Sequence, residues 1–345
     1  MNIFPAIDLF DGKAVRLFKG DYAQMTVYSE NPLEVAQDFE RAGAKFIHLV
    51  DLEGAKTGET PNLETVTAIA ARTGQFTEIG GGVRNMETAE RYFNAGVDRV
   101  IAVGGAQAVA ALTYGAGFIP RVDKLVGPGN AYVAAAKRLA YGSLDIDMVA
   151  GPSEVLVIAD SSADPKYIAA DLLSQAEHDK LASAVLLTDS EELAQAVDGE
   201  IVRQTGYLER SEIMEASLRD FGCAIVCESL SQCVALANEI APEHLEIVTE
   251  DPRVLLPEGK NAGAVFLGAY TPEPLGDYLA GPDHVLPTSG TARFFSPLSV
   301  DSFLKTMSVL EFDRTSLEPI SGEIIALAQA EKLTAHANSI RVRFE

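Results

Sequence analysis

The sequence predicts an α/β protein, and three observations lead to that prediction. The 345 residues are enough for two domains, because single hydrophobic cores usually stop growing near ~250–300 residues. Apolar residues make up 47% of the chain, so sizeable cores can form. Apolar strand-like runs and amphipathic helical stretches alternate along the sequence, a pattern that is typical of parallel sheets with helical crossovers.

The first hundred residues alternate strand and helix signals at regular spacing. Short apolar runs predict strands at Ile3–Asp8, Phe46–Asp51, Phe76–Ile79 and Val97–Val103. Amphipathic stretches predict helices at Pro32–Ala42, Leu63–Thr73 and Met86–Ala95, and we expect a loop between the first strand and the first helix. This order predicts four parallel strands joined by right-handed crossovers.

The rest of the chain continues the α/β pattern. Strands are predicted near Glu154–Ala159, Ala184–Leu187, Ala224–Val226 and Ala264–Leu267. Helices are predicted at Pro165–Ser174, Leu230–Ile240 and Leu317–Ala330, the last followed by a short tail. The Pro- and Gly-rich stretch Tyr270–Pro297 is too long for a simple connector, so we expect it to carry function.

Charge and composition exclude some classes of function. The formal net charge of −23 argues against nucleic-acid binding, because phosphates would be repelled. The sequence contains no run of about 18 apolar residues, so we expect no membrane span. Its start lacks the pattern of a signal peptide. Three closely spaced cysteines without a CxxC pair are typical of reduced thiols, so we expect a cytoplasmic protein.

A few polar residues have a spacing that suits chemistry. Gln175 and His178 are three apart in a helical context, so both side chains are expected on one face, where they could join a mixed N/O zinc site. Asp277 in a Gly-rich loop and His336 in the tail could complete it. Glu243 and His244 are adjacent in a predicted loop. Taken singly, each of these residues is more often an ordinary core or surface residue.

The motifs FPAIDLFDGKAVRL, HLVDLEGAKTG and EIGGGVRNMETAERYFNAGVDRVI make residues 1–101 resemble the phosphoribosylformimino-AICAR ribotide isomerase family of histidine biosynthesis. That family is a (β/α)8 barrel, so the resemblance implies an N-terminal half-barrel, (β/α)4. Asp8 matches the family's first catalytic aspartate, and Gly81, Gly82 and Arg84 match one phosphate loop. The second aspartate and second phosphate loop belong to the missing half, so we expect a scaffold with a vestigial isomerase site.

Residues from about 101 to 345 resemble the histidinol dehydrogenase family. The resemblance lies in motifs that occur in the family's order: AVGGAQAVAALTYG, VDKLVGPGNAYVAAAKR, IDMVAGPSEVLVIAD, DLLSQAEHD, APEHLEIV, GDYLAGPDHVLPTSGTARF and LTAHANSIRVR. The resemblance implies an NAD-dependent oxidation of histidinol to histidine through the aldehyde, with Zn²⁺ bound by Gln175, His178, Asp277 and His336. It implies Glu243 and His244 as the acid–base pair. It assigns Ser153, His244, Glu331 and the four metal ligands to the substrate, and Gln107 and Asn130 to NAD. GPGN at 127–130 could bring backbone N–H groups toward a pyrophosphate.

The predicted fold is therefore an N-terminal half (β/α)8 barrel, residues 1–101, joined to an incomplete Rossmann-like α/β histidinol dehydrogenase fold, residues 102–345. The dehydrogenase family's own N-terminal region is replaced, so we expect exposed apolar edges or a compromised domain, and weak turnover. In the family the tail ligand reaches the zinc of a partner subunit, which implies a homodimer. Two alternatives stay open: a phosphoribosyl isomerase, and a non-catalytic fusion that binds zinc or substrate.

Overall fold

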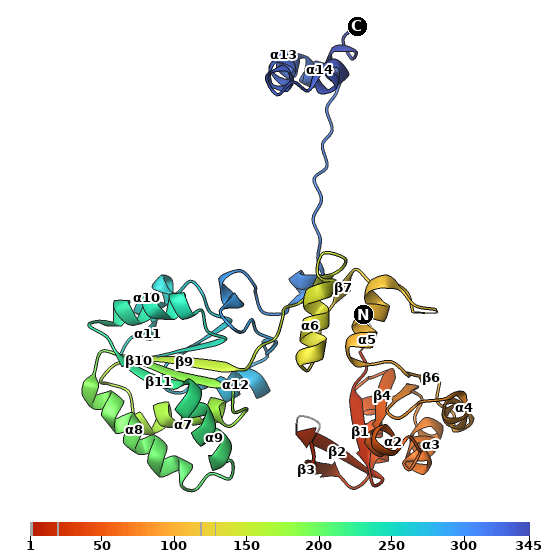
Figure 1. The fold of residues 1–345 in the computed structure, drawn as a ribbon, viewed down its shortest axis with the longest axis vertical. Coiled ribbons are helices and arrows are strands. Elements are labelled where there is room, and N and C mark those ends of the chain that lie inside the picture. Colours follow the sequence, from red (N-terminus) through yellow and green to blue (C-terminus); the bar gives the residue numbers. More distant parts are fainter. Residues whose placement is uncertain (1–2, 19–20, 118, 128) are drawn as a thin grey trace.

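The computed structural model describes residues 3–18, 21–117, 119–127 and 129–345. Figure 1 shows a body that contains two sheets, the N-terminal one in red and orange and the other in yellow to cyan, and a pair of helices at the end of an extended segment. The mixed α/β class with parallel strands is therefore confirmed.

The N-terminal sheet has six strands in the order β3-β2-β1-β4-β5-β6. They are β1 (Ala6–Phe10), β2 (Lys13–Phe18), β3 (Asp21–Ser29), β4 (Phe46–Asp51), β5 (Phe76–Gly80) and β6 (Arg99–Val100). β1, β4, β5 and β6 run parallel, as the alternating pattern predicts. Within the described residues the sheet stays open between β3 and β6, so the half-barrel remains a prediction from the resemblance.

The loop expected after β1 is instead an antiparallel hairpin of β2 and β3. β1 reaches β2 through Asp11 and Gly12, whose φ angles are 49° and 71°. Asp-Gly is a strong two-residue hairpin signal, because both positions need a positive φ. The expectation of a loop was wrong because it passed over this dipeptide.

Three helices cover one face of this sheet: α1 (Pro32–Arg41), α3 (Leu63–Arg72) and α4 (Met86–Asn94), while the short α2 (Leu52–Thr57) follows directly after β4. Alternate strand residues such as Ile47 and Leu49 are fully buried against them. The opposite face carries His48, Glu78 and Arg99, joined by contacts of 2.8 Å (His48 Nδ1–Glu78 Oε1) and 3.0 Å (Arg99 Nη1–Glu78 Oε2). These three side chains form an ion-paired ladder on this face, next to the apolar Phe46 and Phe76, whose ring centroids are 5.8 Å apart.

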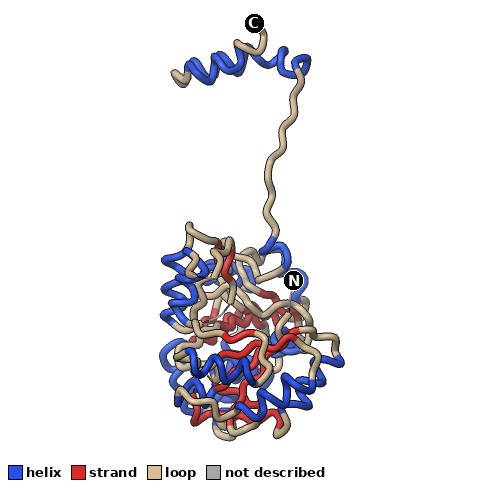
Figure 2. Tube along the Cα trace, turned by 90° about the vertical axis from the view of Figure 1, so that its right-hand side faces the viewer, coloured by secondary structure: helices blue, strands red, loops and turns tan. Residues whose placement is uncertain are grey.

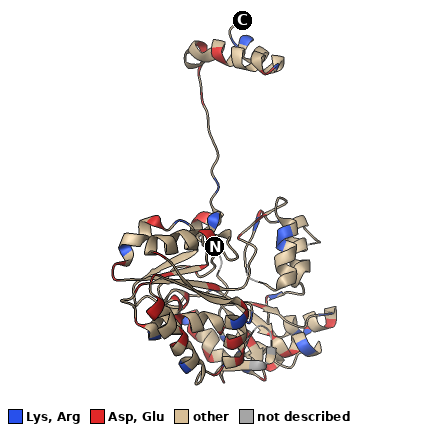
Figure 3. Cartoon of the chain, turned by 60° about the vertical axis from the view of Figure 1, so that its left-hand side comes forward, with Lys and Arg blue, Asp and Glu red and all other residues tan. Residues whose placement is uncertain are grey.

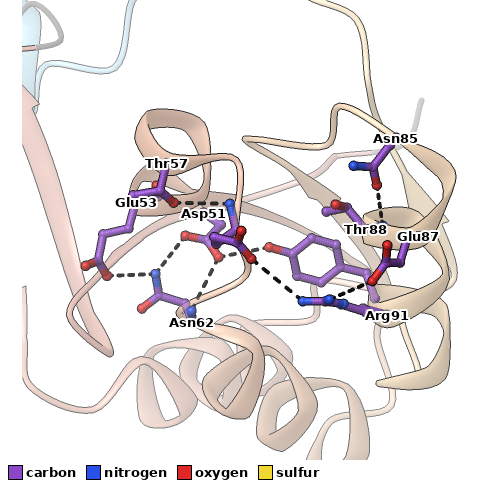
Figure 4. A network of polar contacts seen from close by, with 10 residues as sticks. Asp51, Glu53, Thr57, Asn62, Asn85, Glu87, Thr88 and Arg91 are labelled. Atoms are coloured by element: carbon purple, nitrogen blue, oxygen red, sulfur yellow. Dashed lines mark hydrogen bonds and ion pairs between the residues drawn. The ribbon is translucent and has the colours of Figure 1, made fainter.

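A buried carboxylate organises the carboxyl ends of these strands (Figure 4). Asp51, at the end of β4, accepts hydrogen bonds from Gly54 N, Asn62 Nδ2 and Tyr92 Oη at 2.8, 2.7 and 2.9 Å. Burial and the Asp51 charge raise the pKa of Tyr92 well above its usual value, so the phenol stays a donor. The network ties β4 to α3 and α4.

The next segment is small and has little sheet. It contains α5 (Gly105–Tyr114), β7 (Lys124–Leu125), α6 (Ala131–Ala140) and β8 (Asp145–Ile146). The two strands have two residues each and pair only with one another among the described residues. Val109, Ala140 and Ile146 form its core. The compromised domain expected from the missing family region stays a prediction.

The second large sheet has five parallel strands in the order β11-β10-β9-β12-β13. They are β9 (Glu154–Ala159), β10 (Ser183–Thr188), β11 (Gly222–Val226), β12 (His244–Val248) and β13 (Ala264–Leu267). Numbered from β9, the order is 3-2-1-4-5, which is the arrangement of a doubly wound nucleotide-binding fold. Four strands confirm the predicted segments. β12 was expected to be a loop and is a buried strand.

Helices cover both faces of this sheet. α7 (Pro165–Ala176), α8 (Glu191–Thr205) and α9 (Ser211–Phe221) lie on one face, and α10 (Leu230–Ile240) and α11 (Pro252–Leu255) lie on the other. Successive residues of β9 therefore face different cores: Val155 and Val157 pack toward α7, and Leu156 and Ile158 toward α10.

Beyond β13 the chain becomes irregular. It holds short helices, namely α12 (Glu273–Tyr278) and the 3₁₀ turns η2 (Thr291–Arg293) and η3 (Val300–Phe303), whereas the 3₁₀ turn η1 (Leu256–Glu258) precedes β13. The extended residues 304–313 then lead to α13 (Arg314–Ala330) and α14 (Thr334–Arg341). Figures 1 and 2 both show this helix pair standing away from the body. α13 contains the helix predicted at Leu317–Ala330, and the tail forms α14.

Acidic segments occur over the whole body, with fewer basic ones among them (Figure 3), in line with the net charge of −23. Among the described helices, none has both the length and the apolar character that crossing a bilayer requires.

We predict that Gly82→Ala destabilises the N-terminal unit by more than about 2 kcal/mol. Gly82 has a φ of 72°, and an added Cβ would lie 1.9 Å from Gly54 O. Gly43→Ala is the matched control, because its φ is 97° but nothing lies within 4 Å of the added carbon. Urea unfolding followed by circular dichroism measures both. Equal losses in the two variants would contradict the packing argument.

Candidate metal and catalytic site

The candidate site lies at the amino ends of β9 and β12. Glu154 is the first residue of β9, and His244 is the first residue of β12, paired with Val155. α7 connects the carboxyl end of β9 to the amino end of β10, so its last turn, with Gln175, returns to the same edge. Doubly wound sheets usually bind ligands at the carboxyl ends of their strands. Here the polar residues gather at the opposite edge.

His244 is held in a defined orientation. It is 4% exposed, and its Nδ1 lies 2.8 Å from the carbonyl oxygen of Glu154. A carbonyl only accepts, so Nδ1 donates, and the neutral ring keeps a bare Nε2. Burial lowers the pKa of His244, although the hydrogen bond to Glu154 and the charge of Asp277 oppose this effect. Nε2 has no hydrogen-bond partner and is therefore available as a base or a ligand.

Glu243 and Glu154 fix each other across the two strands. Glu243 Oε2 accepts from Glu154 N at 2.9 Å, and Glu154 Oε2 accepts from Glu243 N at 3.3 Å. Burial, the neighbouring Glu154 and Asp277 raise the pKa of Glu243 to about 8, against the hydrogen bond from Glu154 N. The loop expectation was wrong for His244, which begins the strand HLEIV, whereas Glu243 lies in the connection just before it; both side chains are buried.

α12 brings two carboxyl groups to the same place. The site residue Asp277 was expected in a Gly-rich loop, but it lies on this short helix, one turn after Glu273. His244 Nε2 is 3.9 Å from Glu273 Oε1, and one ligand atom each from His244, Glu273 and Asp277 lie within 4.8 Å of one another. Burial, then Asp277, raises the pKa of Glu273 to about 8. Sequence reasoning missed Glu273; its i, i+4 spacing to Asp277 was the available signal.

Gln175 fits a metal site better than a packed core. Its side chain is 1% exposed, and neither its Oε1 nor its Nε2 has a hydrogen-bond partner. Leaving a buried amide unpaired costs roughly 1–3 kcal/mol, so a ligand bound to this side chain would offset that cost. His178 follows α7 by two residues, and its N–H donates to Gln175 O at 3.1 Å. The helix ends two residues later than the predicted Ser174 and still before His178, and this turn keeps the two residues adjacent.

The charge balance points to a cation. Glu243, Glu273 and Asp277 gather here, and among the residues that the structure describes no lysine or arginine forms a salt bridge with them. Carboxylate, imidazole and amide oxygen are ligands that zinc accepts. The donor set therefore fits a divalent cation of that type.

The predicted NAD residues lie on the small middle segment. Gln107 is exposed in the first turn of α5, and Asn130 caps α6, where its side chain accepts from Tyr132 N and Val133 N at 3.1 Å each. These N–H groups follow GPGN in the sequence and are already satisfied. Residue 128 of that motif lies outside the described residues.

The remaining substrate residues are divided between two places. Ser153 precedes Glu154 and lies beside the site, half-buried. Glu331 and His336 are exposed on the α13–α14 pair, which one chain does not bring to the body (Figure 1). Within a single chain, the predicted four-ligand set is therefore not assembled.

The vestigial isomerase residues are found in the N-terminal unit. Gly81, Gly82 and Arg84 line a cavity of about 280 Å³ with residues 101–104, but Arg84 Nη2 donates to Ala55 O at 2.9 Å. Asp8 lies on β1, half-buried, and burial raises its pKa. An added Cβ at Gly81 or Gly82 would meet backbone atoms within 2.3 Å, so these glycines are needed for packing.

The fold and the site define an α/β protein with a buried N/O site suited to a divalent cation. The chain belongs to the histidinol dehydrogenase family, because the model of that family matches residues 74–344. A second family model, described as histidine biosynthesis protein, matches residues 2–115. Both resemblances inferred from the motifs are thus confirmed.

Curated relatives show the same relationship. A histidinol dehydrogenase of Caldanaerobacter subterraneus subsp. tengcongensis is 64% identical over 249 residues, which are 72% of this chain and 58% of the relative. One from Clostridium acetobutylicum is 57% identical over 251 residues, 73% of this chain and 58% of the relative. The match thus spans less than two thirds of these relatives' length.

A solved structure extends the match. The histidinol dehydrogenase of Elizabethkingia anophelis aligns with 99% of this chain and 70% of its own, at 34% identity and a TM-score of 0.69. The alignment therefore includes the N-terminal unit as well as the dehydrogenase region.

We predict that the Glu243 carboxyl makes the metal-free protein less stable as pH rises from 5 to 8. The unfolded chain releases this proton near pH 4.5, whereas the native state keeps it up to about 8, so the native state binds more protons in that window. The stability of Glu243→Gln relative to the parent should therefore increase by about 1–3 kcal/mol between pH 5 and 8. Urea unfolding at both pH values measures the difference, and a pH-independent difference would contradict the assignment.

Proposed function

We propose that the chain is a zinc-dependent histidinol dehydrogenase that uses NAD to oxidise histidinol to histidine through the aldehyde. The observation that carries this proposal is the unpartnered, buried Gln175 amide at the same sheet edge as His244 Nε2 and the carboxyl groups of Glu273 and Asp277. Family membership supports the reaction, and the site supports a cation and a base in one place.

His244 is the proposed base for each hydride transfer. An alcohol loses a hydride to the nicotinamide only if its hydroxyl proton also leaves, and a neutral imidazole suits that step near neutral pH. Nδ1 donates to Glu154 O, so Nε2 is the atom that receives the proton. The lowered pKa of His244 keeps this atom unprotonated at rest.

Glu243 is the proposed base for the water that adds to the aldehyde between the two oxidations. Its Oε2 is engaged by Glu154 N, which leaves Oε1 to take the proton. A pKa raised to about 8 makes the ionised carboxylate a stronger base than an exposed glutamate.

Gln175, His178 and Asp277 would hold the zinc ion, together with His336. Bound zinc would orient the substrate and polarise its oxygen and nitrogen atoms, without redox chemistry of its own. We propose Ser153 and Glu331 as further substrate contacts, and Gln107 and Asn130 as NAD contacts. We place the boundary between the units at residues 101 and 102.

We propose a homodimer in which α13 and α14 complete the site of the partner. Exposed apolar side chains follow the segment that leads to them, with 57–85% exposure: Leu304, Met307, Val309, Leu310 and Phe312. Apolar groups at this density on an extended arm are expected to be covered by another surface. The three unpaired cysteines fit a reducing compartment, and we propose the cytoplasm.

We expect slow turnover. The middle segment that carries Gln107 and Asn130 has one pair of two-residue strands, so little sheet fixes α5 and α6 against each other. Loose positioning of a cofactor by about 1 Å can cost roughly a hundredfold in rate.

NADH formation from histidinol tests the function. We expect slow, zinc-dependent NADH production, which His244→Gln lowers at least about a hundredfold through loss of the base. His48→Gln, on the N-terminal sheet, is the matched control and should leave the rate unchanged. The absence of any histidinol-dependent NADH, or an unaffected His244→Gln variant, would refute the proposal.

The same assay tests the shared site. A co-refolded mixture of His336→Ala and His244→Gln chains contains heterodimers with one intact site each. If the tail acts on the partner, the mixture should recover about one quarter of the parental rate. No recovery over the separate variants would contradict the shared site.

A further inference from the structure

Glu246 is a further buried carboxyl group near the site, and it is not one of the residues assigned to substrate or metal. Glu246 is 1% exposed and follows His244 by two positions on β12. Strand side chains alternate, so His244 and Glu246 share the face of β12 that is turned toward α7. The intervening Leu245 and the next residue Ile247 belong to the core beneath α10.

Glu246 supplies a helix cap that α12 lacks. Position N-cap of α12 is Pro272, which has no side-chain acceptor for the first free N–H groups. Glu246 Oε1 accepts from Glu273 N, the first residue of the helix, at 2.7 Å.

The cap acts on a very short helix. α12 has six residues, so its own hydrogen bonds fix it weakly, and external contacts decide its position. Asp277 lies in its second turn, and Glu273 faces His244 Nε2 at 3.9 Å. β12 therefore carries both the His244 imidazole and Glu246, which holds the helix that bears Glu273 and Asp277.

Glu246 is also linked to the helix on the other side of the site. Asp171, one turn before Gln175 on α7, interacts with the Glu246 side chain, although Glu246 Oε2 has no regular hydrogen-bond partner. Glu246 thus contacts α12 directly and stands against α7. These are the two helices that carry Asp277 and Gln175.

We propose that Glu246 is a positioning residue that caps α12 from β12 and so sets the distance between Asp277 and the Gln175–His178 turn. The inference rests on the proposed zinc site and extends it to a residue outside the predicted ligand set. Groups that orient metal ligands typically contribute 10- to 100-fold to metal affinity.

Zinc affinity tests the cap without relying on turnover. Zinc is titrated into the metal-free full chain against a chelator of known affinity. Glu246→Leu removes the acceptor and should weaken zinc binding about tenfold or more. Glu246→Gln retains an oxygen acceptor for Glu273 N and should stay within about threefold of the parent.

Ile247→Val is the matched control, because Ile247 is fully buried on the opposite face of the same strand. It should lower stability while leaving zinc affinity unchanged. Equal affinity in the parent and Glu246→Leu would overturn the positioning role and leave the zinc site intact. Equal losses in Glu246→Gln and Glu246→Leu would overturn the capping role. A parent chain that binds no zinc would refute the proposed function and this inference together.

Hydrogen exchange of the parent chain provides a readout that needs no variant. The Glu273 amide is the first of its helix and has no acceptor within α12, so only the bond to Glu246 protects it. Slow exchange of this amide in the metal-free protein is expected. Exchange at the rate of an unstructured amide would overturn the proposal even if Glu246→Leu failed to fold.

Discussion

The burial of several carboxyl groups around one imidazole is the constraint on which the site depends. Glu243 and Glu273 are each less than a tenth exposed, and water no longer stabilises their charges. The raised pKa values of Glu243 and Glu273 reflect the free-energy cost of burying their charged forms. A protein keeps such an arrangement only when protons or a cation neutralise it, so the geometry of β9, β12, α7 and α12 is best understood as a frame for a cation.

The rigid part of this frame is the register between β9 and β12. His244 pairs with Val155, which places Glu154 O against Nδ1 and aligns the reciprocal Glu154–Glu243 contacts. The less rigid parts are the short α12, the two-residue strands of the middle segment and the extended arm before α13. The orientation of His244 and Glu243, the proposed bases, is therefore well fixed in one chain, whereas the proposed NAD contacts and tail ligand depend on weakly held segments.

The N-terminal unit is well packed in itself. Its helices bury one sheet face, its ion-paired ladder covers the other, and Gly81 and Gly82 pack against the backbone near Asp51. A half-barrel sequence thus precedes the dehydrogenase region as a unit with its own hydrophobic core. It does not provide the sheet that would support α5 and α6.

The sequence predicted the parts of the fold that periodicity controls. Strands such as Glu154–Ala159 and helices such as Leu230–Ile240 were located closely, because apolar runs and helical spacing define them. The hairpin after Asp11 was missed although its Asp-Gly turn was visible. The strand that begins at His244 was predicted as a loop, because His244 and Glu246 interrupt the apolar run formed by Leu245, Ile247 and Val248.

The site was predicted less completely than the fold. Resemblance located Gln175, His178, His244 and Asp277, and the structure brings these four to one edge of the sheet. Glu154, Glu246 and Glu273 escaped prediction because their roles arise from pairing across strands and from the cap of a six-residue helix. Such contacts join residues up to about 90 positions apart, which sequence spacing does not reveal.

X-ray absorption spectroscopy of the zinc-loaded chain tests the central claim most directly. A site built from amide, imidazole and carboxylate groups predicts a first shell of nitrogen and oxygen atoms at about 2.0–2.2 Å. Sulfur scattering at about 2.3 Å would place the metal on cysteines instead. That result, or a chain that retains no zinc, would contradict the account.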